Sequence, residues 1–273
     1  MISTNELVDL ALTMSGMEKL SADSAVYVEG NELSKVLFGI DIGAAELLLA
    51  RDLGCDGVIA HHPAGGSAIL RFPEVLTRQL EFMLEHGVPE DEARDAVQPM
   101  ITRATMGSHA RNHDHVPSVA RALGMPFMNM HLPLDELGRQ MMVEVIHDHL
   151  STLGGDPTVQ DAINALMTMP EFVSAVTPIM VPVGGVSEPL GQYAIVHAAG
   201  TNGGAHVARA YFRNGIDTVL YIHCAGDEVM RLQQESGGNL IVSGHISSDM
   251  VGINPYVREI EARGVEVIRI SGL

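Results

Sequence analysis

The fold class is decided by residues 218–249, which read TVLYIHCAGDEVMRLQQESGGNLIVSGHISSD. An apolar, β-branched run over 218–222 is followed by an amphipathic stretch over 226–235 and by a second apolar run over 240–242. Short apolar runs that alternate with helical stretches are typical of β-α-β units and of a parallel sheet. This part of the chain therefore predicts an α/β fold.

The same alternation of strand and helix patterns extends from this stretch toward both ends of the chain. Downstream, the pattern predicts a helix over 249–263 and a closing strand over 265–268, and upstream a strand over 193–196 and a helix over 203–213. Further strands are predicted over 25–28, 36–40, 57–60 and 126–130. We expect a layered sheet-and-helix fold of two similar β-α-β halves with largely parallel strands.

The domain organisation is read from turn signals. Gly154-Gly155-Asp156-Pro157 is the best linker in the chain, because glycine and proline interrupt both helices and strands. We therefore expect an N-terminal half over 1–150, with a helical insertion at about 64–125, and a C-terminal half over 151–273; one continuous domain is the alternative. Within the insertion, Pro99 is expected to kink or end a helix.

Composition excludes several classes of function. The 273 residues carry a net charge of −18, which disfavours binding to nucleic acids and to anionic membranes. Lys19 and Lys35 are the only lysines, which excludes a P-loop. We expect no transmembrane helix and no secretory signal. Cys55 and Cys224, the only cysteines, are too few for a disulfide scaffold, so we expect a cytoplasmic protein.

Histidines follow the predicted strands at their carboxyl ends. Five strands are followed by such residues, namely His61 with His62, then His131, His197, His223 and His245. In a parallel α/β sheet this edge is where ligands bind. A single strand-end histidine is commonly structural, but the set points to a metal site of imidazoles and carboxylates, which suits Zn, Mn, Fe, Co or Ni.

Two aspartates lie where they could complete such a site. Asp135 comes four residues after His131, and Asp249 comes four residues after His245. If the second segment starts a helix, His245 and Asp249 share one face of it and can bind one cation. The alternative for Asp135 is a helix cap, and for Asp249 a carboxylate facing a helix dipole.

Read together, five segments resemble the Nif-three-like family, often labelled GTP cyclohydrolase one type two homologues. They are Phe38–Asp41, Leu53–Pro63 with its His-His-Pro signature, Met130–Asp135, the glycine-rich 198–204, and Ser243–Asp249. The resemblance covers about two thirds of the chain, and the ordered set of motifs is more specific than His-His-Pro alone.

The resemblance implies a centre of two divalent metal ions held by His61, His62, Asp135, His245 and Asp249. It also implies a homohexamer and a metal-dependent hydrolase, similar to GTP cyclohydrolase one type two, that uses metal-bound water on a nucleotide or another small phosphorylated or heterocyclic substrate. Three departures stand out: Asp249 replaces the family glutamate, Pro133 replaces a small polar residue, and the 64–125 segment is longer than usual. The alternative function is a non-catalytic metal-binding assembly or interaction protein.

The remaining candidates keep two interpretations each. The turn Gly200–Gly204 could cradle an anion or be a simple tight turn. His109, His113 and His115 could form a lid, a surface metal site or a solvated loop. His223 and Cys224, with Asp227 and Glu228, could contact the metal ligands and orient them. They could instead form only a strand end and a helix cap.

Overall fold

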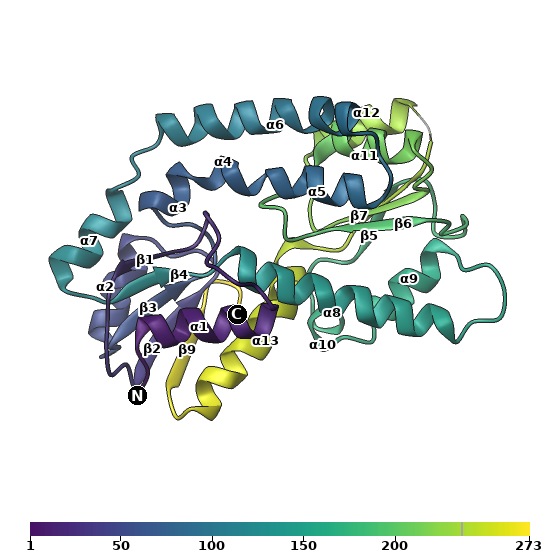
Figure 1. The fold of residues 1–273 in the computed structure, drawn as a ribbon. Helices are drawn as coiled ribbons and strands as arrows, with labels where there is room; N and C mark the ends of the chain where they lie inside the picture. The colour runs from purple at the N-terminus through teal and green to yellow at the C-terminus, as the bar shows by residue number, and fades with distance from the viewer. Residues whose placement is uncertain (236) are drawn as a thin grey trace. The chain divides into compact units, whose positions relative to one another are not determined.

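The computed structural model describes residues 1–235 and 237–273 (Figure 1). The chain forms two compact units, each assembled from separate segments. Unit 1 comprises Met1–Val75, Arg103–Leu137 and Gly252–Leu273, and unit 2 comprises Leu76–Thr102 and Gly138–Val251. The units are thus interleaved along the chain, and the division into halves at residue 150 stays a prediction.

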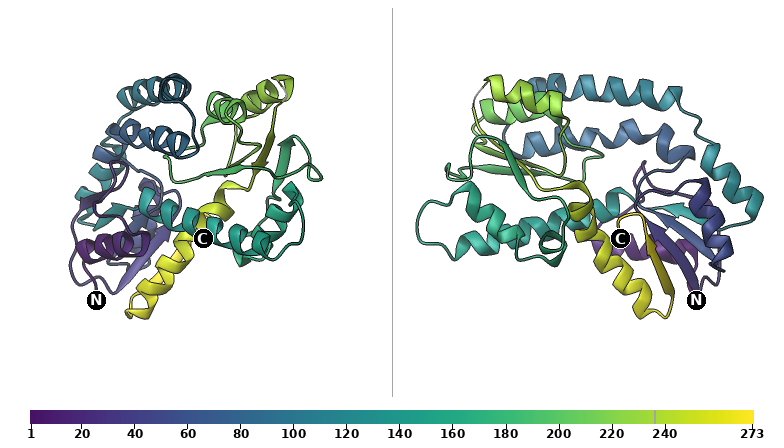
Figure 2. Two further views of the ribbon diagram at one scale, coloured as in Figure 1. Left: turned by 45° about the vertical axis from the view of Figure 1, so that its right-hand side comes forward. Right: turned by 180° about the vertical axis from the view of Figure 1, so that it is seen from behind.

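Unit 1 is built on a five-stranded sheet in the order β1-β4-β3-β2-β9. Only β1 runs antiparallel to its neighbour, and β9 lies parallel to β2 at the opposite edge (Figure 2). Its strands are β1 (Ala25–Val28), β2 (Lys35–Gly39), β3 (Gly57–Ala60), β4 (Phe127–Asn129) and β9 (Glu266–Ile270). Its own helices are α1 (Thr4–Ser15), α2 (Ala44–Asp52), α3 (Gly66–Leu70), α4 (Phe72–Val75) and α7 (His115–Leu123).

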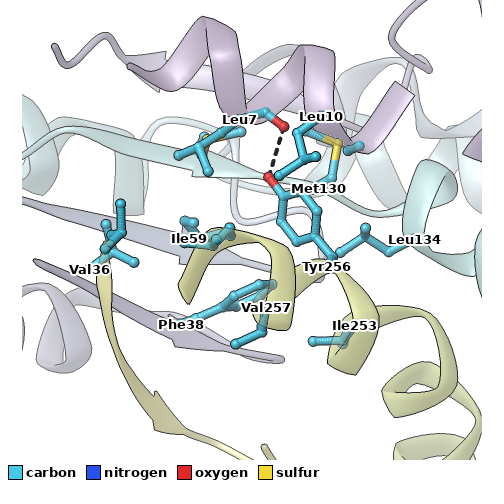
Figure 3. Close-up of a cluster of buried hydrophobic side chains, with 14 of the residues drawn as sticks. Leu7, Leu10, Val36, Phe38, Ile59, Met130, Leu134, Ile253, Tyr256 and Val257 are labelled. Atoms are coloured by element: carbon cyan, nitrogen blue, oxygen red, sulfur yellow. Dashed lines mark hydrogen bonds between the residues drawn. The ribbon is translucent and has the colours of Figure 1, made fainter. Parts of the chain in front are cut away.

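The core of unit 1 joins the N-terminal helix to the C-terminal part of the chain (Figure 3). Helix α1 begins with a capping box in which Ser3 and Glu6 each bond the other's backbone N–H. Leu7 and Phe38 lie in one buried cluster with Tyr256, whose hydroxyl donates to the carbonyl oxygen of Leu7 at 2.8 Å. This contact ties residues 249 positions apart in the sequence.

Unit 2 is built on a four-stranded sheet in the order β5-β8-β7-β6, in which only β5 runs antiparallel. Its strands are β5 (Met180–Val183), β6 (Tyr193–Val196), β7 (Thr218–Tyr221) and β8 (Asn239–Val242). Its own helices are α5 (Thr77–Glu85), α9 (Val159–Leu166), α10 (Pro170–Val173), α11 (Gly204–Arg213) and α12 (Gly226–Glu235). Three longer helices contribute residues to both units, α6 (Glu90–Ala110), α8 (Leu132–Ser151) and α13 (His245–Ala262).

Helix α6 continues through Pro99, the residue expected to kink or end it. A proline in a helix removes one backbone donor and deprives the carbonyl four residues earlier of its partner. That residue is Asp95, which is exposed, so water can take the carbonyl's hydrogen bond.

The two sheets repeat one pattern. In each, an antiparallel strand pairs with the last of three consecutive parallel strands, so that β1–β4 correspond in order to β5–β8, and unit 1 adds the parallel strand β9. Gly39 pairs with Ala60 in unit 1 as Val196 pairs with Tyr221 in unit 2. The α/β class and the two similar halves expected from the sequence are confirmed. Among the described residues, no helix combines the length and the apolar character that crossing a membrane requires.

Candidate metal centre

In unit 1, three histidines meet at the carboxyl ends of β3 and β4. Backbone pairing continues just past the strands, since His61 N–H donates to Gly39 O and His62 N–H to Ile40 O. His61 is wholly buried and His131 is 6% exposed. Potential ligand atoms of His61, His62 and His131 lie within 4.8 Å of one another. These three residues could hold a metal ion.

Hydrogen bonds at Nδ1 fix the tautomer of these three imidazoles. His61 Nδ1 lies 3.0 Å from the carbonyl oxygen of Met130, and because a carbonyl can only accept, this nitrogen carries the ring proton. His62 Nδ1 donates in the same way to Asp41 at 2.8 Å, and His131 Nδ1 to Asp23 at 2.7 Å. In the neutral ring, each Nε2 then offers its lone pair, which is the form that binds metals.

Asp135 adds a carboxylate to this group. It lies in the first turn of α8, four residues after His131, and is 4% exposed. Its Oδ1 is 3.2 Å from His61 Nε2, and its Oδ2 is 3.7 Å from His131 Nε2. A buried carboxylate that faces two imidazole lone pairs is a donor set that a divalent cation satisfies, so the residues of unit 1 fit the expected metal.

In unit 2, His245 and Asp249 form the pair that their spacing predicts. Helix α13 begins at His245, so both side chains lie on one face, with His245 Nε2 3.3 Å from Asp249 Oδ2. Asp249 is 2% exposed. The preceding turn needs Gly244, because its φ is +105° and a Cβ there would lie 2.7 Å from the Ser247 hydroxyl.

Comparison with known proteins then identifies the family. No protein-family model matches the chain, and neither does any curated protein. Among solved structures, that of a NIF3 superfamily protein from Sphaerobacter thermophilus matches with 65% sequence identity and a TM-score of 0.98, covering 100% of this chain and 99% of that one. The chain belongs to the NIF3 superfamily.

More distant structures share the fold of this NIF3 chain. Reduced HcgD from Methanocaldococcus jannaschii matches at 11% identity and a TM-score of 0.57, covering 98% of this chain and 97% of that one. TTHA1606 from Thermus thermophilus matches at 17% identity and a TM-score of 0.55, covering 99% and 98%. These two show the fold alone, and the 65% identical structure confirms the family membership that the ordered motifs indicate.

The five predicted ligands of the NIF3 chain fall into two groups. His61, His62 and Asp135 lie in unit 1, and His245 and Asp249 lie in unit 2. Each group is brought together within its own unit. The complete five-ligand set stays a prediction, as does the ability of Asp249 to replace the family glutamate.

A buried polar network behind the unit 1 histidines was not foreseen from the sequence. Asn129 donates to the backbone carbonyls of Asp23 and His61, and accepts from the Tyr27 hydroxyl at 2.6 Å. Burial raises the pKa of Tyr27 to about 12, so the hydroxyl keeps the proton that it donates. Asp23 itself is wholly buried. No periodicity marks these residues, because Asn129 lies 106 positions from Asp23 and 102 from Tyr27 in the sequence.

The structure also bears on the candidates outside the five predicted ligands. At the amino end of α11, the Glu228 carboxylate accepts the backbone N–H of Ala205 at 2.8 Å and so occupies the place of an external anion. This favours the tight-turn interpretation of Gly200–Gly204. Burial raises the pKa of the neighbouring Cys224 thiol to about 11, which disfavours a thiolate ligand there. Among described residues, His109, His113 and His115 belong to no potential metal-binding group.

Proposed function

We propose that this NIF3 protein is a metal-dependent hydrolase with a centre of two divalent cations. The observation that carries the proposal is the cluster in unit 1 of three Nδ1-anchored histidines, two of which, His61 and His131, face the buried carboxylate of Asp135. Unit 2 supplies a second histidine-aspartate pair, spaced by four residues at the start of the helix that follows the equivalent strand. The proposed ligands are His61, His62, Asp135, His245 and Asp249, and His131, whose Nε2 faces Asp135, is a sixth candidate in unit 1.

The ligand residues of unit 1 have definite tasks in this proposal. The two oxygens of Asp135 face the imidazoles of His61 and His131, so this carboxylate would hold metal together with both rings. Met130 O and the Asp41 carboxylate hold the rings of His61 and His62 in the metal-binding tautomer. Divalent cations in such a pair lower the pKa of bound water and stabilise charge on the attacking and leaving oxygens.

The proposed substrate class comes from the family resemblance, and the charge of the chain bears on how such a substrate would be attracted. With a net charge of −18, the protein offers an anionic substrate little general attraction, so the cations themselves would attract it. We propose a nucleotide or another small phosphorylated or heterocyclic substrate, similar to that of GTP cyclohydrolase one type two. A cytoplasmic homohexamer completes the proposal; the hexamer rests on the family resemblance, and the compartment rests on the low number of cysteines.

The test combines metal analysis with a substrate panel. The purified chain is loaded separately with Mn, Zn, Fe, Co and Ni, and then assayed against nucleotides and phosphoesters. We expect two ions per chain, and turnover that is lost in both His62→Ala and His245→Ala but kept in the exposed control His147→Ala. Two ions without turnover on any substrate would instead favour the non-catalytic metal-binding protein, and absence of metal would refute the centre.

A further inference from the structure

The orientation of one side-chain amide determines the chemistry of a further histidine in unit 2. Asn202 Oδ1 accepts the backbone N–H of Gly204 at 3.0 Å, and its Nδ2 lies 2.8 Å from His223 Nδ1. A backbone N–H can only donate, so the oxygen must face Gly204 and the amide N–H₂ must face His223. His223 Nδ1 is therefore an acceptor.

This hydrogen bond gives His223 the opposite tautomer to the three histidines of unit 1. A ring whose Nδ1 accepts is neutral and carries its proton on Nε2. His62 occupies the equivalent place in unit 1, two residues past the end of β3 as His223 is two past β7, yet its Nδ1 donates to Asp41. His62 thus offers a lone pair at Nε2, whereas His223 offers an N–H.

The ring of His223 lies beside a proposed metal ligand. The rings of His223 and His245 lie with centroids 4.6 Å apart at 47°, and His223 is half-buried. The next residue, Cys224, is a thiol whose pKa burial raises to about 11. A neutral imidazole N–H next to a metal ligand can donate to an oxygen that carries or develops negative charge.

We propose that His223 is a substrate-binding residue whose Nε2–H donates to an anionic oxygen, such as that of a phosphoryl group, and that Asn202 positions it by fixing its tautomer. The proposal rests on the metal centre proposed above, and it deepens that proposal by naming a group that recognises the substrate. It also excludes His223 from the ligands, because an Nε2 that carries the proton has no lone pair for a metal.

The first experiment reads the tautomer directly. Long-range ¹H–¹⁵N spectra of histidine-labelled, zinc-loaded protein distinguish Nε2–H, Nδ1–H and doubly protonated rings, and His223→Gln assigns the signal. We expect the neutral Nε2–H form. In Asn202→Asp the carboxylate accepts from both sides, so the proton of His223 is expected to move to Nδ1. A wild-type His223 that carries its proton on Nδ1 would overturn the proposal.

The second experiment uses inorganic phosphate as the probe. Zinc content is measured first, and phosphate affinity is then measured by calorimetry for wild type, His223→Leu, His223→Gln and the exposed control His206→Leu. Since a hydrogen bond to a charged acceptor is lost, His223→Leu should bind phosphate about 10- to 100-fold more weakly. His223→Gln, whose amide can donate from a similar place, should recover most of this loss.

The outcomes separate this proposal from the metal centre itself. Full zinc content with wild-type phosphate affinity in His223→Leu overturns the donor role and leaves the metal centre standing. Loss of zinc in His223→Leu shows that His223 is a ligand, which also overturns it. A wild-type chain that takes up no zinc refutes the metal centre, and the substrate role of His223 falls with it.

Discussion

Asp23 offers the sharpest single test of how unit 1 prepares its histidines. The carboxylate is wholly buried, and its Oδ2 accepts from His131 Nδ1 at 2.7 Å while its Oδ1 accepts from the Ser21 hydroxyl at 2.5 Å. In Asp23→Asn the amide can keep its oxygen toward His131 and turn its N–H₂ toward Ser21, whose hydroxyl can rotate to accept. The substituted side chain keeps the shape of the aspartate and loses its negative charge.

The magnitude follows from that lost charge. A carboxylate that accepts from Nδ1 of a metal-binding histidine raises the basicity of its Nε2. Removal of such a carboxylate weakens metal binding about 10- to 100-fold. The exchange of a charged acceptor for a neutral one should also lower the free energy of unfolding by about 1 kcal/mol. Zinc affinity is measured by competition with a coloured chelator, and stability by urea unfolding of the metal-free protein.

The matched control is Asp56→Asn, at another carboxylate of unit 1. Asp56 accepts from the backbone N–H and hydroxyl of Ser34 and from the backbone N–H of Lys35, at distances of 2.6–3.0 Å. This variant should lose some stability and bind zinc as wild type does. The reasoning is refuted if Asp23→Asn keeps wild-type zinc affinity, or if Asp56→Asn weakens zinc binding equally.

Three further predictions concern stability and are checked by urea unfolding. Tyr256→Phe should cost about 1–3 kcal/mol, because the buried carbonyl of Leu7 loses its bond from the hydroxyl. Gly65→Ala should cost about 1–3 kcal/mol or more, because the new Cβ would lie 2.5 Å from Pro117. Hydrogen bonds from Ser34 hold the pKa of Asp56 below 3.8, so its stabilisation is present above that pH and is lost as pH falls further. Between about pH 6 and pH 3, wild type should therefore lose more stability than Asp56→Asn.

Much of the fold and part of the candidate site could be predicted from local patterns in the sequence. The apolar runs place His61 and His131 at strand ends, and the four-residue spacing places Asp135 and Asp249 one turn from a histidine. These predictions depend on neighbours in sequence, which is why they succeed. The identity of the family likewise rests on short motifs in order.

The partners that make these histidines useful could not be predicted in the same way. Asp23 reaches His131 across 108 positions, and Asn129 supports the backbone of His61 across 68. The pairing of β1 with β4 brings the Asp23 and His131 segments together. Sequence periodicity describes which face of an element is buried, but carries no information about which distant acceptor meets a given ring nitrogen.

One long-range signal does lie in the sequence, and it concerns the difference between two equivalent histidines. His62 is anchored by Asp41 and His223 by Asn202, and in both pairs the partner lies 21 residues upstream. An aspartate can only accept, so it draws the ring proton to Nδ1 and leaves Nε2 for a metal. Asn202 turns its N–H₂ toward the ring, because Gly204 already occupies its oxygen, and so keeps the proton on Nε2. The change from acid to amide at one spacing therefore separates an imidazole that offers a lone pair at Nε2 from one that offers an N–H there, on two halves of similar fold.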